Sequence, residues 1–270
     1  MDASTSYSQD RIDALNNAYN HETNENAKWA LNLMIENLKI AKLKKRPLCD
    51  DTGVPHVFIE VGDKSNSFSQ NIIEDIKKGI ASGLKNLPGR PMAVKGNDIQ
   101  RLEQSQGLYE KSEKLIPPSF LIDSYNGDKT RIHLLLLGGG PEIRAKTYRV
   151  FHERSSEKIF KIAINYLNEV LPQLGCTPSI PSIGIGRTHF EANSLMLKSM
   201  VFGDLNNQSE IEKYLTKEIN KSKIGTMGLG GDTTVLGTFV NIGPQRASGV
   251  RIMAIRPSCF IEPRIATVEI

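Results

Sequence analysis

The sequence predicts an α/β fold, a single mixed-sheet domain flanked by helices. Amphipathic helical patterns alternate along the chain with short runs of β-forming residues, and no repeat or low-complexity linker interrupts them. Hydrophobic residues make up 39% of the 270 residues, which is typical of a globular protein. A chain of this length buries a substantial core without a disulfide or a structural metal.

Five segments are predicted to be helices. Residues 27–41 place apolar side chains on one helix face, and this pattern stops before Pro47. Isoleucine or leucine recurs every four residues over 72–84, and we expect that helix to end at Pro88 and Gly89. The other helical patterns cover residues 157–171, 191–200 and 209–220.

Strand signals precede and follow these helices. Residues 56–61 are rich in β-formers, and the apolar runs 120–123 and 131–137 are joined by a loop containing Asn126-Gly127. This dipeptide predicts a β-hairpin. Further strands are expected at residues 183–185, 233–240, 250–255 and 266–269.

Composition excludes several classes of protein. The formal net charge is only +4, and the one dense basic cluster, residues 42–46, lies at a helix end where cations complement the helix dipole. We therefore expect no nucleic-acid partner. The longest apolar run, near Leu134 to Leu137, is too short to cross a bilayer, and the polar start shows no secretory signal. The sequence indicates a cytoplasmic protein without a membrane partner.

The three cysteines, Cys49, Cys176 and Cys259, are spread over the whole chain and form no C-x-x-C pair. Each lies at the edge of a regular element, beside glycine or proline residues that allow tight turns. The residues alone leave two interpretations open: buried apolar thiols, or ligands of a metal. Asp50 and Asp51, which follow Cys49, similarly either form a turn before Gly53 or contact a ligand.

Nucleotide binding is a weaker alternative. Gly184-Ile185-Gly186 follows a predicted strand but lacks the third glycine of a dinucleotide-binding fingerprint. The stretch from Met227 to Asp232 lacks the Gly-Lys-Ser/Thr ending of a phosphate-binding loop. None of the five histidines has a metal-ligand spacing to another, which favours structural roles for them.

Five segments, in order, resemble those of class I fumarases and L-tartrate dehydratase α subunits. CDDTG at Cys49 is similar to the family's CQDTG, and GGGPE at Gly138 to its GGGSE. GCTPSIPSIGIGRT at Gly175 is similar to a GCPP-type segment ending in GIGGT, and IGTMGLGGDTTVLG at Ile224 to IGPMGLGGKTTVLG. The tail, RASG followed by Cys259, matches the segment that ends at the third cysteine. The resemblance covers residues 25–270 as one catalytic domain and leaves residues 1–24 as an N-terminal extension.

The resemblance implies that Cys49, Cys176 and Cys259 hold a 4Fe-4S cluster at the edge of the sheet. Most such clusters take four thiolates, so three leave one iron open, as a Lewis-acid catalyst requires. The implied activity is a hydro-lyase reaction on a small hydroxy-acid, either fumarate/malate-like or tartrate-like. In this family the proton-abstracting threonine lies in a second half, so the resemblance implies a β-type subunit that carries the base, in a hetero-oligomer.

The implied substrate-binding residues are Asp50, Asp51, Gly139, Gly140, Arg187 and Arg246, with Asp51 also as the catalytic residue. Several positions depart from the family pattern: Asp50 replaces a glutamine, Glu110 replaces an expected arginine, Leu137 a lysine, Gln245 a histidine and Arg187 a glycine. These changes remove cations and predict poor turnover of fumarate and malate, with Arg187 and Arg246 returning positive charge for another acid.

Because the substrate shell is altered, a second function stays open. The chain could be a non-catalytic or differently reacting iron–sulfur protein that kept the scaffold and lost the usual substrate contacts. Arg187 and Arg246 would then be ordinary surface or ion-pair residues.

Overall fold

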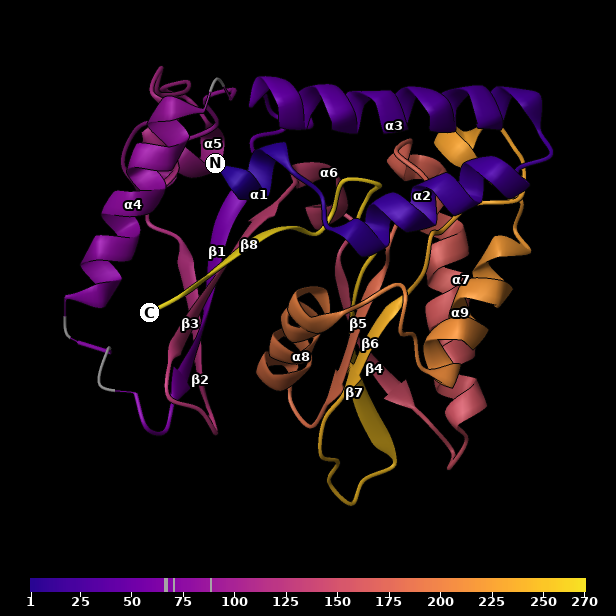
Figure 1. The fold of residues 1–270 in the computed structure, drawn as a ribbon. Coiled ribbons are helices and arrows are strands. Elements are labelled where there is room, and N and C mark those ends of the chain that lie inside the picture. The colour runs from indigo at the N-terminus through magenta and orange to yellow at the C-terminus, as the bar shows by residue number, and fades with distance from the viewer. Residues whose placement is uncertain (66–67, 70, 88) are drawn as a thin grey trace. The chain divides into compact units, whose positions relative to one another are not determined.

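The computed structural model describes residues 1–65, 68–69, 71–87 and 89–270 (Figure 1). These residues form two compact units. The first contains Met1–Ser6, Leu38–Gly139 and Arg264–Ile270, and the second contains Tyr7–Asn37 and Gly140–Pro263. The chain therefore leaves the first unit twice and returns to it with its last residues.

The first unit is built on a four-stranded mixed sheet in the order β2-β1-β3-β8. Strand β1 pairs in parallel with β2 and antiparallel with β3, and β3 pairs antiparallel with β8. The strands are β1 (Val54–Gly62), β2 (Ser119–Tyr125), β3 (Thr130–Leu137) and β8 (Arg264–Glu269). The helical segments are α1 (Asp2–Thr5), the end of α3 (Glu25–Lys44), α4 (Ile72–Asn86), α5 (Asp98–Glu103) and the 3₁₀ helix η1 (Ser112–Leu115).

The core of this unit lies between α4 and one face of the sheet. Val57 and Ile59 of β1 alternate toward α4, where Ile80 and Leu84 are one helical turn apart. Four apolar side chains of this size, removed from water, each contribute about 1.5–3 kcal/mol. This packing supports β1 and the loop before it, which carries Cys49.

The second unit has another four-stranded mixed sheet, in the order β4-β7-β5-β6. Strand β7 pairs antiparallel with β4 and β5, while β5 and β6 are parallel. Its strands are β4 (Lys146–Phe151), β5 (Ser182–Gly186), β6 (Phe239–Ile242) and β7 (Val250–Arg256). Its helical segments are α2 (Gln9–His21), the first part of α3, α6 (Gly139–Glu142, which begins at the last residue of the first unit), α7 (Ser156–Leu174), α8 (His189–Phe202), α9 (Glu210–Asn220) and the 3₁₀ helix η2 (Thr226–Gly228).

Helices cover both faces of this second sheet (Figure 1). On one face, Leu167 of α7 and Ile219 of α9 pack with Ile183 of β5 in the main core. On the other face, α8 packs Met196 against Ala254 of β7. Strand β5 is buried at every residue because it is covered on both sides. This three-layer arrangement positions the loops at the ends of α7 and β7, which carry Cys176 and Cys259.

The mixed α/β class is confirmed, and all five predicted helices are present. Pro88, the expected end of the second one, lies outside the described residues. The strands form two sheets in two units, rather than the one sheet that we predicted. Periodicity identifies a strand from local residues, whereas the choice of partner depends on contacts far apart in the sequence. Strand β8, for example, pairs with β3 about 130 residues earlier.

The predicted β-hairpin of residues 120–137 is wrong. Strand β1 lies between β2 and β3, so the two strands flanking Asn126-Gly127 do not pair with each other. The turn instead contacts the end of β1: Gly127 donates a hydrogen bond to Asp63 and accepts one from the Lys64 amide. The buried β1 needs partners on both edges, and this requirement overrides the local turn signal.

Two other strand assignments differ. Of the predicted strand 233–240, only the end belongs to β6, because the amides of Thr234 and Val235 bind the side chain of Asn220 instead of a neighbouring strand. Strand β4 was not predicted. Among the described residues, no helix has the length and apolar character needed to cross a membrane.

Candidate functional site

The second and third cysteines lie in adjacent segments of the second unit. Helix α7 ends at Gly175, whose left-handed conformation turns the chain into Cys176. The carbonyl of Cys176 accepts a hydrogen bond of 3.1 Å from the amide of Phe260, the residue after Cys259. Cys176 is half-buried and Cys259 is buried. Two of the three cysteine segments that the sequence singled out are therefore joined by a backbone hydrogen bond.

The glycine-rich segment at Ile224 also contacts the Cys176 segment. The hydroxyl of Thr177 donates to the carbonyl of Gly225 at 2.6 Å, and the amide of Met227 donates to the carbonyl of Thr177 at 2.9 Å. The amide of Gly228 reaches the same hydroxyl at 3.3 Å. Two of the motifs that carry the resemblance thus meet in space.

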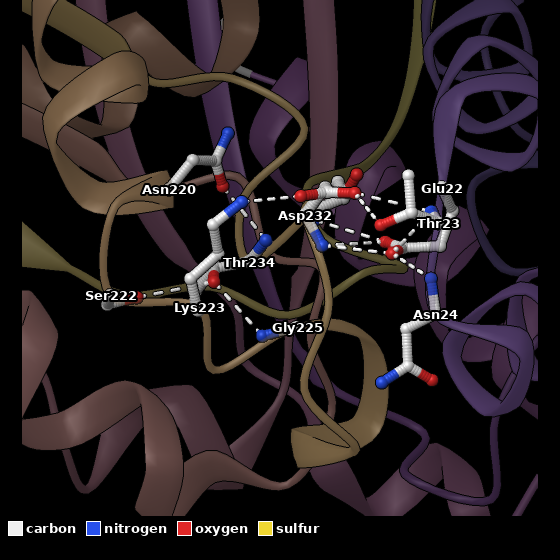
Figure 2. A network of polar contacts seen from close by, with 10 residues as sticks. Glu22, Thr23, Asn24, Asn220, Ser222, Lys223, Gly225, Asp232 and Thr234 are labelled. Atoms are coloured by element: carbon white, nitrogen blue, oxygen red, sulfur yellow. Dashed lines mark hydrogen bonds and ion pairs between the residues drawn. The ribbon is translucent and has the colours of Figure 1, made fainter.

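Figure 2 shows how this glycine-rich loop is held at its other end. Glu22 is buried, and its carboxylate accepts hydrogen bonds from four backbone amides at 3.0–3.2 Å, those of Thr23, Asn24, Asp232 and Thr233. Amide donors satisfy a buried carboxylate without a cation. No sequence motif points to Glu22, which lies in the part of the chain that we predicted to be an N-terminal extension.

Asp232 lies where the resembling segment has a lysine. It forms an ion pair with Lys223 and accepts a 2.6 Å hydrogen bond from the hydroxyl of Thr23 (Figure 2). These contacts, Lys223 first, lower the pKa of Asp232 to about 2. Asp232 is therefore ionised at neutral pH and helps to fix the loop.

Two glycines of this loop provide a matched test of its geometry. Gly225 and Gly228 have φ angles of +72° and +71°, but a Cβ on Gly225 would lie 1.8 Å from the carbonyl oxygen of Gly230, whereas a Cβ on Gly228 meets nothing within 4 Å. We expect Gly228→Ala to lower the free energy of unfolding by about 1–2 kcal/mol, the cost of a left-handed alanine.

Gly225→Ala should cost at least about 4 kcal/mol, since backbone must also move. Urea unfolding of both variants measures the difference. Equal losses would contradict the close approach of the two loop strands at Gly225.

A buried arginine links two further motifs within the second unit. Arg256, at the end of β7, is fully buried and binds Glu262 through two hydrogen bonds of 3.0 Å. It also forms an ion pair with Glu142, the acid of the GGGPE segment. Burial opposes the charge of Arg256, but the two carboxylates keep its pKa above the usual value. The segment around Cys259 is thus fixed from both sides.

Residues 1–24 contribute to the same region. The hydroxyl of Tyr7 donates to the carbonyl of Phe260, and the buried Arg11 donates to the carbonyl of Pro263. The guanidinium of Arg11 lies 5.5 Å from the ring centre of Tyr7, within the range of a cation–π contact. The chain after Cys259 is therefore supported by side chains from the predicted extension.

The first cysteine belongs to the first unit, in the loop before β1. Asp51 accepts hydrogen bonds with both carboxylate oxygens, from the amide of Gly53 at 3.0 Å and from that of Gly139 at 2.8 Å. The turn that we predicted as one role for Asp51 is therefore present, and it also joins the CDDTG and GGGPE segments. Contact of Asp51 with substrate stays a prediction.

Arg264, the first residue of β8, is buried beside this loop. Its Nη1 atom donates to the carbonyl oxygens of Asp51 at 2.5 Å and Thr52 at 3.3 Å. Burial raises the pKa of the Cys49 thiol, and the positive charge of Arg264 acts in the opposite direction. Sequence reasoning missed Arg264, although it follows Cys259 by only five residues.

An open hollow lies beside Cys49. Pro47, Cys49, Asp50, Gly89 and Arg90 line it, and Arg90 forms an ion pair with Asp50 at 3.4 Å. Both side chains are largely exposed to solvent. The altered residues were predicted to remove cations near the open iron, and Arg90 is a cation beside Cys49 that the sequence analysis did not consider. It was missed because it lies about 40 residues from Cys49 in the sequence.

The remaining predicted residues have local partners. Arg187 binds Glu191 on the first turn of α8 through several hydrogen bonds of 2.6–3.1 Å. The carbonyls of Gly140 and Arg246 accept hydrogen bonds from Arg144 and Arg251. Gln245 donates to the carbonyl of Ile185. The ion pair of Arg187 with Glu191 is the surface role that the sequence analysis gave as an alternative to substrate binding. Substrate binding by Arg187 stays a prediction.

The donor chemistry of these segments fits an iron–sulfur group. All three cysteines lie in loops next to strands or helices, and the buried Nε and Nη2 atoms of Arg264, beside the Cys49 loop, have no hydrogen-bond partner among the described residues. Within that part of the chain, no three His, Cys, Asp or Glu side chains form a metal-binding group. Because Cys49 belongs to one unit and the other two cysteines to the second, their convergence stays a prediction.

Comparison with known proteins identifies the family. The sequence model of fumarate hydratase (fumerase) matches residues 1–269, nearly the whole chain. The chain belongs to the fumarate hydratase family. The match includes residues 1–24, so the family pattern extends over the segment that contains Tyr7, Arg11 and Glu22.

The names of similar proteins are consistent with membership of the fumarate hydratase family. It is 34% identical to a putative L(+)-tartrate dehydratase subunit alpha of Methanocaldococcus jannaschii, over 87% of this chain and 82% of the relative. It is 31% identical to a putative fumarate hydratase class I of Geobacillus stearothermophilus, over 79% of this chain but 42% of that longer protein. The L(+)-tartrate dehydratase subunit alpha of Escherichia coli is 22% identical over 97% of this chain.

Proposed function

We propose that this chain is the cluster-binding α-type subunit of an iron–sulfur hydro-lyase, which adds or removes water on a small hydroxy-acid. Membership of the fumarate hydratase family supports hydro-lyase chemistry. The names of the relatives, tartrate dehydratase α subunits and a fumarate hydratase, support a hydroxy-diacid substrate. We expect the protein to be a soluble cytoplasmic enzyme.

Hydrogen bonds around the three cysteine segments support the proposal. The Cys176 carbonyl binds the amide after Cys259, and five residues after that cysteine Arg264 binds the loop that follows Cys49. Within the second unit two of the three cysteine segments are thus in contact, and within the first unit the loop after Cys49 is held by Arg264. Deprotonated, the three thiols would hold a 4Fe-4S cluster, which with three thiolates supplies a Lewis acid for removal of a hydroxyl group.

The protein's own residues would bind and orient the acid. In the hollow beside Cys49, the exposed guanidinium of Arg90 is suited to a substrate carboxylate, with which it can form two parallel hydrogen bonds. Asp50 holds Arg90 in place before substrate arrives and offers a hydrogen-bond acceptor. Tartrate carries a second hydroxyl that malate lacks, so an acceptor at this position favours tartrate. Asp51 would act by holding the Cys49 loop against Gly139.

We further propose that the catalytic base comes from a β-type subunit. Two of the three relatives are named as alpha subunits, which supports such a partner. We expect the isolated chain, purified without oxygen and loaded with iron and sulfide, to lack measurable turnover. Addition of a β-type chain should restore it.

The test uses the isolated chain and the two-chain complex with tartrate, malate, fumarate and mesaconate as substrates. We expect the complex to prefer tartrate, and Arg90→Met to raise KM more than it lowers kcat, since it removes a ground-state contact. Efficient turnover by the isolated chain would contradict the need for a partner. Loss of activity toward every acid with an intact cluster would favour a non-catalytic role.

A further inference from the structure

We propose that Arg264 is a positioning residue for the cluster. Its side chain is a buried cation, and its Nε and Nη2 atoms would donate hydrogen bonds to the negatively charged cluster that the cysteine thiolates hold. This inference rests on the proposed function. It assigns to a residue outside the cysteine motifs a role in holding the Cys49 loop and in setting the charge balance of the bound cluster.

Arg264 is buried, and among the described residues no acidic side chain pairs with it. Arg264 is 2% exposed, and its Nη1 atom binds only carbonyl oxygens, those of Asp51 and Thr52. Its Nε and Nη2 atoms are buried and have no hydrogen-bond partner in the described part of the chain. A buried charge that lacks a partner costs several kcal/mol, so such a group is normally paired. The Nε and Nη2 atoms of Arg264 are therefore available to bind an anion.

Arg256 provides the comparison within the same protein. It is also fully buried, but Glu262 and Glu142 supply two carboxylates, one of them buried as deeply as the arginine itself. This protein can thus pair a buried arginine with acidic side chains. Since no described side chain accepts a hydrogen bond from Nε or Nη2 of Arg264, we infer that these atoms bind an anion other than those side chains.

Arg264, at the start of β8, binds the loop that follows Cys49. The carbonyls that it binds belong to the two residues after Asp50, so the guanidinium fixes the turn directly after Cys49. A Cβ on Gly53 would lie 2.3 Å from Nη2 of Arg264. A glycine at the end of CDDTG therefore makes room for the guanidinium. The sequence of the loop and the buried arginine therefore fit each other.

The chemistry of the ligand follows from charge. A 4Fe-4S core with three thiolates carries net negative charge, and its reduction adds one more electron. Net charge and hydrogen bonds to the sulfur atoms set the reduction potential of such clusters. A cation with two free donors beside the Cys49 loop would stabilise the reduced form more than the oxidised form.

The test compares Arg264→Met and Arg264→Lys with wild type, and uses Arg101→Met, a surface arginine paired with Asp98 in the same unit, as the control. Each chain is reconstituted without oxygen. Iron and sulfide content, reduction potential, rate of cluster loss to a chelator, and thermal unfolding of the cluster-free chain are measured.

We expect Arg264→Met to lower the reduction potential and to lose its cluster about 10–100-fold faster, the range for outer-shell partners of a metal site. Arg264→Lys should restore the potential, because it keeps the charge, but not the slow release, because it lacks the planar fork. The cluster-free Arg264→Met chain should be no less stable than wild type, since it loses an uncompensated buried charge.

Three results would overturn the inference: an unchanged potential in Arg264→Met, an unchanged release rate in both variants, or equal effects in Arg101→Met. If Arg264→Met fails to fold, the release rate of Arg264→Lys decides. Absence of a cluster from the wild-type chain would instead overturn the proposed function, so the two failures are distinguishable.

Discussion

Replacement of Cys49, Cys176 or Cys259 by serine, one at a time, is expected to remove the cluster and reduce the activity of the two-chain complex by more than about 100-fold. Even outer-shell partners of a metal site cost 10–100-fold in metal affinity or activity, and a ligand should cost more. The chain has only three cysteines, so no other thiol can replace the missing one. The three variants should therefore be equally inactive.

Visible absorbance of the anaerobically reconstituted variants measures the cluster, and steady-state turnover measures the activity. Urea unfolding of the cluster-free chains provides the control, because serine is close to cysteine in size and each variant should fold. A variant that keeps both absorbance and activity would show that its cysteine is one of the buried apolar thiols that the sequence also allows.

Replacement of Arg256 by methionine is expected to have a large effect on stability. It leaves Glu262, which is fully buried, without its cation, and Glu142 loses the same partner. Removal of one member of a buried ion pair typically costs about 3–5 kcal/mol, because the remaining charge stays desolvated. The cluster-free chain should show this loss in urea unfolding.

Two controls make the Arg256 result specific. The double variant Arg256→Met/Glu262→Gln should recover part of the loss, since it removes the buried negative charge as well. Arg187→Met removes an exposed ion pair with Glu191 and should change stability little. A small effect of Arg256→Met, or no recovery in the double variant, would mean that the segment around Cys259 does not depend on this ion pair.

Helices could be predicted from the sequence because their signals are local. The apolar spacing over residues 72–84 and the serine before Glu210 are sufficient to locate α4 and α9, and in the structure Ser209 caps α9 together with Glu212. The pairing of the strands could not be predicted in this way. Nothing between residues 120 and 137 indicates that β1, some 60 residues earlier, would separate the two apolar runs.

The candidate site shows the same contrast between residues with local sequence signals and residues whose roles depend on distant contacts. The cysteines could be singled out because they occur in three of five segments that keep the family's order, whereas the residues that support them could not. Glu22, Arg11, Arg256 and Arg264 are charged, and charged residues are rarely buried, so a single sequence suggests the surface for all of them. Their roles depend on carbonyls and carboxylates that are distant in sequence. Arg90 was missed for the same reason.

The most direct test of the central claim, that three cysteines hold one cluster with an open iron, is the count and chemical state of iron in the wild-type chain. The chain should be reconstituted anaerobically with ⁵⁷Fe and analysed for iron, sulfide and Mössbauer spectrum. We predict about four irons and four sulfides per chain, with one iron spectroscopically distinct from the other three and altered by addition of a hydroxy-acid. A two-iron cluster, a single iron, or four equivalent irons that do not respond to the acid would contradict the account.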